Sequence, residues 1–483
     1  MAKVEVGGRK ELGADGVDRR TFIKVSAVAA ASAVAGSWPQ QAWAVPNPLI
    51  VDVSNIPVPD FTASNRHAGV EALLRTLACA GVYFYQADSR FPLSDPSTGL
   101  IARDDVVLIK VNGQWQYRGV TNSDVVRGVI QRVLDHPEGF TGEVVIIENG
   151  QSVGSLNCDK GWAGTYPDQN VHANAEDTTQ SFQWLINNVF PTNKVSGYLL
   201  DPIRGTQVPA GNHTTQGYRR LGSVSYPCFT TAQSRRVELH DGIWDGSAYN
   251  QKLKLLNIPV FKDHSGSAIT GALKHMYGVL STSLVSYNLH YTQIGYATAD
   301  MHTLVRTPAL NIVDCIWVST QLAGYPQNVT HRANRLLAGF DPVALDYHAG
   351  KHILFAWDGN SYHNPDSSVD YQAFLTQARD RINTNGGIHG QPVTFNEASF
   401  NVVPGDASAM PDPPRELLLS KSNGEIRLDW SGGTPPFRVW RSRTRDFSDA
   451  VAIKDLYTER FYVDAGALSD GNLYFYRVES ALS

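Results

Sequence analysis

The chain has 483 residues, of which 42% are hydrophobic, 18% charged and 10% aromatic, and this composition excludes a disordered, fibrous or coiled-coil protein. Its formal net charge is −5, from 41 Lys and Arg residues against 46 Asp and Glu residues. Such a mildly acidic chain lacks the basic surface that nucleic-acid phosphates require, so no nucleic-acid partner is expected.

The N-terminal residues have the pattern of an export signal. Arg19 and Arg20 precede an apolar run over 25–36, and a small-x-small pattern that a signal peptidase could cut ends at Ala44. The arginine pair resembles a twin-arginine signal, which implies the twin-arginine translocase as a partner during export. We expect residues 1–44 to be removed, leaving no membrane anchor and a soluble protein that is periplasmic or extracellular.

The first regular elements form a strand–helix–strand unit. Residues 105–111 and 143–149 are continuous apolar runs, typical of strands buried on both faces. Between them, Thr121 or Ser123 can cap a helix whose apolar side chains recur every three or four residues as far as Leu134. This order predicts a βαβ unit with parallel strands and a right-handed crossover.

Polar side chains follow these strands. A third apolar run, residues 255–261, predicts another strand, and a helix after Gly266 would place Thr270, Lys274 and Gly278 on one face. The carboxyl ends of parallel strands share one edge, where open α/β sheets bind ligands. The side chains expected along this edge are those of Lys110, Asn112, Glu148, Lys262, Asp263 and His264.

Three further elements carry acidic residues. Residues 310–318 read as a strand with Asp314 at its centre, where a carboxylate needs either a buried hydrogen-bond partner or a functional role. A short strand at 335–339 leads to Asp341, which precedes a Pro and fits a helix cap better than a ligand. Asp346 lies within the first turns of that helix.

The remaining parts of the chain have distinct compositions. Residues 150–250 have little periodicity and suggest a loop-rich insertion with short strands that could form a lid or one wall of a cleft. Residues 401–414 have linker composition, and 415–483 contain alternating segments separated by Gly turns. Trp430 in an early strand and Tyr476 in a late one resemble a fibronectin type III sandwich.

Several blocks of the body occur in the order seen in a known family. They lie at residues 105–112, 119–121, 145–148, 262–264, 269–278, 312–314 and 339–346. Over roughly residues 60–400 they resemble the domain of unknown function 362 family, which implies an α/β fold but no established reaction. We therefore expect an α/β domain over 45–400, with a mainly parallel sheet and flanking helices, followed by the linker and a small all-β sandwich.

The four cysteines lie 70 to 87 residues apart, at Cys79, Cys158, Cys228 and Cys315. This spacing fits neither a zinc ribbon nor an iron–sulfur ligand run. Some relatives of the resembled family carry cysteine-rich ferredoxin-like segments, which this chain lacks, so no iron–sulfur cofactor is expected. Disulfides and buried thiols both remain open.

Charged side chains beside buried strands need partners or a ligand, because burying an isolated charge is costly. The functional interpretation is that lysines and a histidine hold an anionic group while an acidic residue transfers protons; the alternative is a structural ion-pair network. The catalytic candidates are Glu148, Asp263, His264 and Lys274, and the ligand-binding candidates are Lys110, Asn112, Thr121, Lys262, Thr270 and Asp314.

A bound metal ion is a further open alternative. The histidines at positions 290 and 302 and the pair His240-Asp241 match no HxxxH or HExxH helix pattern. The candidates for metal ligands are Asp263, His264, His290, Asp341 and Asp346.

Known catalytic motifs narrow the choice of function. No GxSxG elbow, GxGxxG turn or phosphate-binding P-loop appears in a strand–turn–helix context, where the turn leads directly from the strand into a helix. We expect an exported enzyme that acts on an anionic small molecule or polymer end bound at the strand carboxyl ends, with its reaction type open. The alternatives are a non-catalytic extracytoplasmic ligand-binding protein and a metal-dependent redox protein folded before export.

Overall fold

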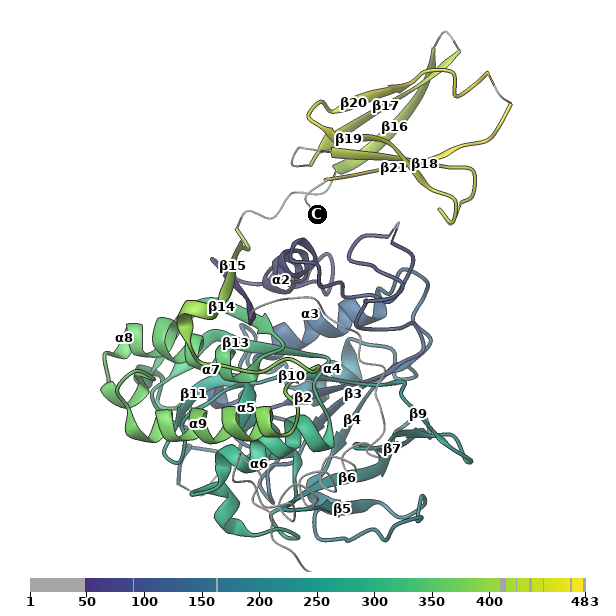
Figure 1. Ribbon diagram of the computed structural model, residues 1–483. Coiled ribbons are helices and arrows are strands. Elements are labelled where there is room, and N and C mark those ends of the chain that lie inside the picture. Colours follow the sequence, from purple (N-terminus) through teal and green to yellow (C-terminus); the bar gives the residue numbers. More distant parts are fainter. Residues whose placement is uncertain are drawn as a thin grey trace, which may run out of the picture. The chain divides into compact units, whose positions relative to one another are not determined.

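The computed structural model describes residues 48–89, 91–161, 164–408, 414–422, 424–433, 437–445, 447–469 and 471–480. The expected signal peptide lies outside these residues. The described residues from 48 to 408, called the body below, form an α/β domain, and those from 414 to 480 form a small all-β sandwich (Figure 1). The fold class predicted from the sequence is confirmed.

The body is built on one ten-stranded sheet. Its strands are β1 (Leu49–Ser54), β2 (Val106–Val111), β3 (Glu143–Glu148), β4 (Val195–Leu199), β10 (Leu253–Ile258), β11 (Val260–His264), β12 (Ala268–Thr270), β13 (Leu310–Ser319), β14 (Thr330–Gly339) and β15 (Asn401–Asp406). The order is β15-β1-β14-β13-β10-β2-β3-β4, with β11 beside β13 and β12. The strands from β13 to β4 run parallel, whereas β14 is antiparallel to both neighbours.

The central strands are buried because both faces of the sheet are covered. Every residue of β2 and β3 is buried, as their continuous apolar runs predict. Helices α2, α3 and α4 pack together on one face, and α5, α6, α7 and α9 form the layer on the other (Figure 1). The helices are α2 (Ala68–Cys79), α3 (Ser123–Leu134), α4 (Phe182–Asn188), α5 (Ala272–His275), α6 (Ile294–Asp300), α7 (Pro342–Ala349), α8 (Ala356–Asp358) and α9 (Val369–Thr384).

The predicted starts of α3 and α7 are correct to within one residue. The cap of α3 is Asn122, between the two expected candidates Thr121 and Ser123, and its side chain accepts from the backbone N–H groups of two residues in the first turn. Asp341 caps α7 as expected, accepting from the backbone N–H groups of Val343 and Ala344.

The third predicted strand is divided in two. Pro259 separates β10 from β11, because proline has no N–H for the ladder. β10 pairs with the first half of β13 and β11 with its second half, so that Leu256 lies opposite Leu310 and Lys262 opposite Ser319. Lys262 therefore lies within a strand and does not follow one.

Two other expectations need correction. Thr270 ends β12 and is not helical. The sequence did not reveal this strand, because three residues are too few to show an alternating pattern. Residues 401–406, expected within the linker, form β15 and pair in parallel with β1.

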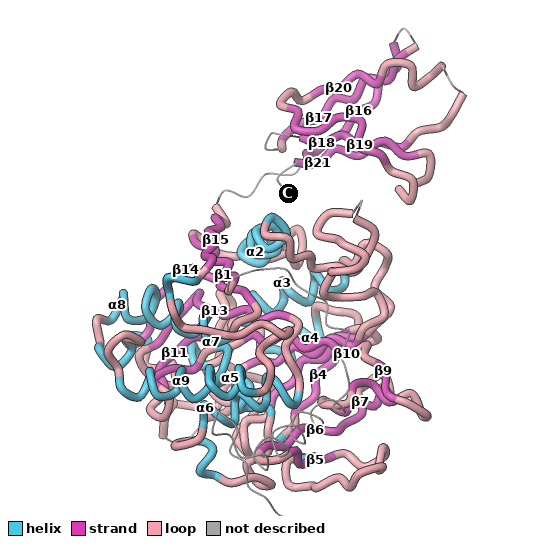
Figure 2. The backbone as a smooth tube through the Cα atoms, viewed as in Figure 1, coloured by secondary structure: helices cyan, strands magenta, loops and turns pink. Residues whose placement is uncertain are grey.

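The loop-rich insertion is only partly separate from the sheet. Its segment β4 is the edge strand of the main sheet, and α4 also lies within it. Its last part forms a five-stranded antiparallel sheet whose strands are joined by short turns (Figure 2). The strands of this second sheet are β5 (Gly217–Leu221), β6 (Val224–Thr230), β7 (Arg236–Glu238), β8 (Gly242–Trp244) and β9 (Tyr249–Asn250).

The C-terminal sandwich consists of two three-stranded antiparallel sheets, β16-β17-β20 and β19-β18-β21. Its core includes Leu428, Trp430, Phe437 and Val439. The strands are β16 (Pro414–Ser422), β17 (Glu425–Gly432), β18 (Phe437–Ser442), β19 (Val451–Tyr457), β20 (Phe461–Asp464) and β21 (Phe475–Ser480).

The cysteines are free thiols, with Cys79 exposed and the other three buried. Within the described ranges, no helix is both long enough and apolar enough to cross a membrane.

Candidate functional site

Lys110, near the carboxyl end of β2, is buried and fully hydrogen-bonded. Its Nζ lies 2.5 Å from Glu148 Oε2 at the end of β3 and 2.6 Å from the carbonyl oxygen of Val111. The third neighbour is His275 Nε2, at 3.1 Å. The structure thus brings together Lys110 and Glu148, as the parallel strand order predicts.

The contacts of two asparagines define the protonation of His275. Asn257 donates its side-chain N–H to the carbonyl of Ala272 and to Asn311 Oδ1, so its own Oδ1 must be the acceptor that faces His275 Nδ1 at 2.7 Å. Nδ1 therefore carries the ring proton. Burial and the nearby Lys110 hold the pKa of His275 well below its usual value, so its Nε2 accepts from Lys110.

These contacts leave Lys110 without spare donors. Its three N–H groups are directed to a carboxylate, a carbonyl and an imidazole. Burial lowers the pKa of Lys110, and the Glu148 carboxylate opposes this shift. We call Lys110, Glu148, His275, Asn257 and Asn311 the Lys110 network, and it is structural because its polar groups satisfy one another.

The hairpin of β11 and β12 presents a different set of groups. Lys262 and His264 are two residues apart on β11 and so share one face, and Thr270 lies directly opposite Lys262 in the antiparallel ladder. Asp263, between them, points to the other face. With Lys274 of α5 added, Lys262, His264 and Thr270 form what we call the cation site.

Lys262 is buried, with only one hydrogen bond among the described residues. Its Nζ donates to the carbonyl oxygen of Gly119 at 2.5 Å and lies 5.6 Å from the ring centroid of Trp115. Burial and the charge of Lys274 lower the pKa of Lys262 well below its usual value. Two of its donor positions remain for a ligand.

Lys274 has even fewer partners. It is 9% exposed, and in the part of the chain that the structure describes its Nζ has neither a hydrogen-bond acceptor nor a carboxylate partner. Its ammonium lies 5.8 Å from the ring centroid of Tyr277. Burial, with the neighbouring Lys110, lowers the pKa of Lys274 to about 7.

His264 contributes a hydrogen-bond donor to the cation site. Its Nδ1 accepts from the backbone N–H of Gly266 at 3.0 Å, so the proton of the neutral ring is on Nε2. Burial and the charges of Lys274, His290 and Lys262 hold the pKa of His264 well below its usual value. The ring of His290 lies beside it, with centroids 5.2 Å apart.

Asp263 belongs to a separate contact on the other face of β11. Its Oδ2 lies 2.9 Å from His363 Nε2, and His363 Nδ1 lies 2.5 Å from Asp358 Oδ2. The two carboxylates raise the pKa of His363 although burial lowers it. The arrangement ties β11 to the segment after α8, and sequence reasoning missed His363 because no periodic element surrounds it.

Other ligand-binding candidates are used by the fold. Asn112 Oδ1 accepts from the backbone N–H of Val260, and Thr121 donates to the carbonyl of Ile258, so both residues hold the bend between β10 and β11. Asp314 accepts from the backbone N–H of Asn122 at 2.8 Å, and burial raises its pKa to about 7.

The metal-ligand candidates do not come together in one metal site among the described residues. Within the described residues, no group of three or more His, Cys, Asp or Glu side chains is placed to hold a metal ion. Asp346 accepts from the backbone N–H groups of Ala272 and Leu273 at the start of α5, and Asp341 caps α7. The buried His302 ring faces the carbonyl of Ala272 at 3.2 Å.

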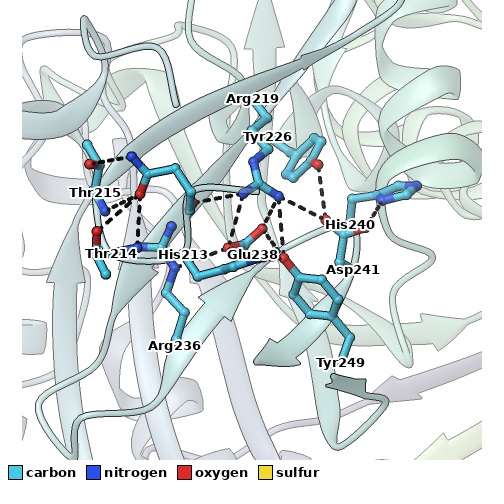
Figure 3. A network of polar contacts seen from close by, with 11 residues as sticks. His213, Thr214, Thr215, Arg219, Tyr226, Arg236, Glu238, His240, Asp241 and Tyr249 are labelled. Carbon is cyan, nitrogen blue, oxygen red and sulfur yellow. Dashed lines mark hydrogen bonds and ion pairs between the residues drawn. The ribbon is translucent and has the colours of Figure 1, made fainter. Parts of the chain in front are cut away.

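A second polar cluster, on the sheet of β5 to β9, shows how cations are paired elsewhere (Figure 3). The buried carboxylate of Glu238 pairs with Arg219, accepts from the hydroxyl of Tyr249, and lies 3.0 Å from His213 Nδ1 and 3.3 Å from Arg236 Nε. The cations of this cluster form ion pairs with a carboxylate, whereas Lys262 and Lys274 form none with any described residue. The cation site therefore differs from a structural ion-pair network.

All four residues of the cation site were candidates from the sequence, but Asn257 and His275 of the neighbouring Lys110 network were not. Asn257 could have been noticed as a polar residue within an apolar strand, and His275 as the neighbour of Lys274. Their roles depend on partners far along the chain, since His275 and Lys110 are 165 positions apart.

Comparisons with known proteins give one match. No curated protein and no solved structure matches the chain. One family model matches residues 238–350, which contain the cation site, while the resembling blocks before position 150 lie outside the match. Over residues 238–350 the chain is thus similar to the family described as Domain of unknown function (DUF362).

Proposed function

We propose that this chain is an enzyme that acts on a small molecule or polymer end carrying an anionic group, which binds at the cation site. Lys262 and His264 would hold the anion through N–H donors, and Thr270 would add a hydroxyl. Lys274 would be the catalytic group, since a buried amine with a pKa near neutrality can accept a proton or act as a nucleophile.

The observation that carries this proposal is that two buried lysines of the cation site have no ion-pair partner among the described residues. Lys262 and Lys274 are both buried, and neither has a carboxylate partner among the described residues. Burying unpaired cations opposes folding, so a bound anion would supply the charge that the chain does not. Lys110 is the contrasting case, because this buried lysine forms an ion pair with Glu148.

The proposal is tested by presenting a panel of small organic acids to the intact chain and following their conversion by NMR. We expect conversion of at least one acid and its loss in Lys262→Met and Lys274→Met, but not in Lys252→Met, which changes an exposed lysine. Binding of an acid without conversion would identify a non-catalytic ligand-binding protein instead. If no acid binds, the proposal is wrong.

The cellular setting is proposed from the sequence. The arginine pair and the apolar run of residues 1–44 support export by the twin-arginine route to the periplasm or beyond. For the C-terminal sandwich we propose a fibronectin type III-like module, supported by its two three-stranded sheets and by Trp430 in its core.

A further inference from the structure

We propose that His363 is a positioning residue for the cation site and acts through the carboxylate of Asp263. Asp263 lies between Lys262 and His264 on β11, so a contact that fixes Asp263 also fixes the residues on either side of it. This inference rests on the proposed function, because it concerns what holds the same site in shape.

His363 is bound by carboxylates at both of its ring nitrogens. Its Nε2 lies 2.9 Å from Asp263 Oδ2, and its Nδ1 lies 2.5 Å from Asp358 Oδ2. A carboxylate oxygen accepts hydrogen bonds, so each ring nitrogen carries a proton and the ring is an imidazolium. The side chain is only 1% exposed, and charge-assisted hydrogen bonds shielded from water are strong. Burial lowers the pKa of His363, but the two carboxylates outweigh burial and raise it.

The imidazolium of His363 joins three separate elements. Asp263 belongs to β11, Asp358 is the last residue of α8, and His363 is the last residue of the 3-10 turn Ser361–His363. Asp358 Oδ1 also accepts from the backbone N–H of Asn360 at 2.9 Å, so this carboxylate is itself held in place. The contact therefore fastens β11 to a segment that lies 100 positions later in the chain.

Tyr362, the neighbour of His363, holds the same hairpin at its turn. The Tyr362 hydroxyl lies 2.9 Å from the carbonyl oxygen of Ser265 and 3.3 Å from that of His264. In this turn the backbone N–H of Gly266 donates to His264 Nδ1, which leaves the ring proton on Nε2. Two consecutive residues thus hold the hairpin, one at the strand and one at the turn that orients the His264 ring.

The strand geometry transmits this hold to the cation site. Successive side chains of a strand point to opposite faces, so Asp263 is anchored on one face while Lys262 and His264 lie on the other. Thr270 lies opposite Lys262 in the ladder and moves with it. A shift of the hairpin by about 1 Å would lengthen hydrogen bonds to a bound anion beyond their usual range.

The test compares calorimetric titrations of malonate into the intact chain and into His363→Gln. One end of the Gln amide donates and the other only accepts, so it cannot serve both carboxylates, and we expect the affinity for malonate to fall by about tenfold or more. Adding Asp358→Asn gives the amide oxygen a donor and should restore most of the affinity. The matched control is His213→Gln on the second sheet, whose histidine also pairs with a buried carboxylate, and it should bind malonate as the unchanged chain does.

Two further measurements separate positioning from a general loss of stability. Tyr362→Phe removes one hydroxyl from a partly buried side chain and should weaken malonate binding by about threefold, with little change in denaturant unfolding. The nitrogen NMR signals of the His264 ring should shift in both His363→Gln and Tyr362→Phe, and they should stay in place in His213→Gln.

The outcomes distinguish this inference from the proposed function. Malonate binding of equal strength in the unchanged chain, His363→Gln and Tyr362→Phe, with unshifted His264 signals, would overturn the positioning role and keep the anion site. An equal loss of affinity in His213→Gln would also overturn that role. If the unchanged chain binds no malonate, the proposed function is wrong, and the His264 signals still report whether His363 shapes the hairpin. If His363→Gln does not fold, Tyr362→Phe decides the matter.

Discussion

Lys110 and Lys274 are two buried lysines whose surroundings are opposite. Lys110 has three acceptors, including the carboxylate of Glu148, whereas Lys274 has none among the described residues. A buried cation contributes to stability only when its partners compensate for lost hydration. The two side chains should therefore respond in opposite directions to the same substitution.

Lys110→Met should lower the free energy of unfolding by about 3–5 kcal/mol, because it leaves Glu148 buried without its cation. Lys274→Met should raise it by about 0.5–2 kcal/mol, a gain typical of replacing a functional group that opposes folding. Denaturant unfolding of the two variants measures both changes. Equal losses of stability would show that Lys274 has structural partners like those of Lys110.

Asp314 connects two elements, because its carboxylate accepts from Asn122 at the start of α3 and from Ile316 within β13. Burial raises its pKa to about 7, from an ordinary value of 3.8. The folded chain therefore holds a proton that the unfolded chain releases between about pH 4 and pH 7. The contribution of this bound proton to the free energy of unfolding is fully present below about pH 4 and is lost as the pH rises through about 7.

Asp314→Asn removes that titration while keeping a side-chain acceptor. We expect the stability of the variant, relative to the unchanged chain, to increase between pH 5 and pH 8. Denaturant unfolding at the two pH values measures the difference. If the variant and the unchanged chain differ in stability by the same amount at pH 5 and at pH 8, Asp314 is ionised in the folded chain throughout this range.

The short 3-10 turn Tyr117–Gly119 supplies the carbonyl that accepts from Lys262. A Cβ on Gly119 would lie 2.2 Å from the carbonyl oxygen of Ala323, so a side chain there cannot fit without movement of the backbone. Gly119→Ala should therefore lower the free energy of unfolding by about 1–3 kcal/mol and weaken anion binding by shifting this carbonyl.

Gly205→Ala is the matched control, since a Cβ there meets nothing within 4 Å. It should leave both unfolding and anion binding unchanged. If Gly119→Ala behaves in the same way, the close approach to Ala323 does not constrain this turn.

Across the whole molecule, the sequence encodes the sheet more directly than the site. Continuous apolar runs mark strands buried on both faces, and their parallel order places Lys110 and Glu148 together at one edge. The bend at Pro259 moves Lys262 into a strand that pairs with the far half of β13. No local pattern predicts this change of partner.

The sequence also cannot reveal which lysine has partners. The acceptor of Lys262 is Gly119, 143 positions away, and the imidazole beside Lys110 is 165 positions away. Residue type and spacing predicted a cluster of charges at this edge. Only the three-dimensional contacts separate the satisfied Lys110 from the cation site.

The most direct test of the central claim is a calorimetric titration of malonate into the intact chain, repeated with Lys262→Met and with Lys252→Met. The account predicts saturable binding of one malonate per chain, lost in Lys262→Met and kept in Lys252→Met. Equal binding to all three proteins, or none to the unchanged chain, would contradict it.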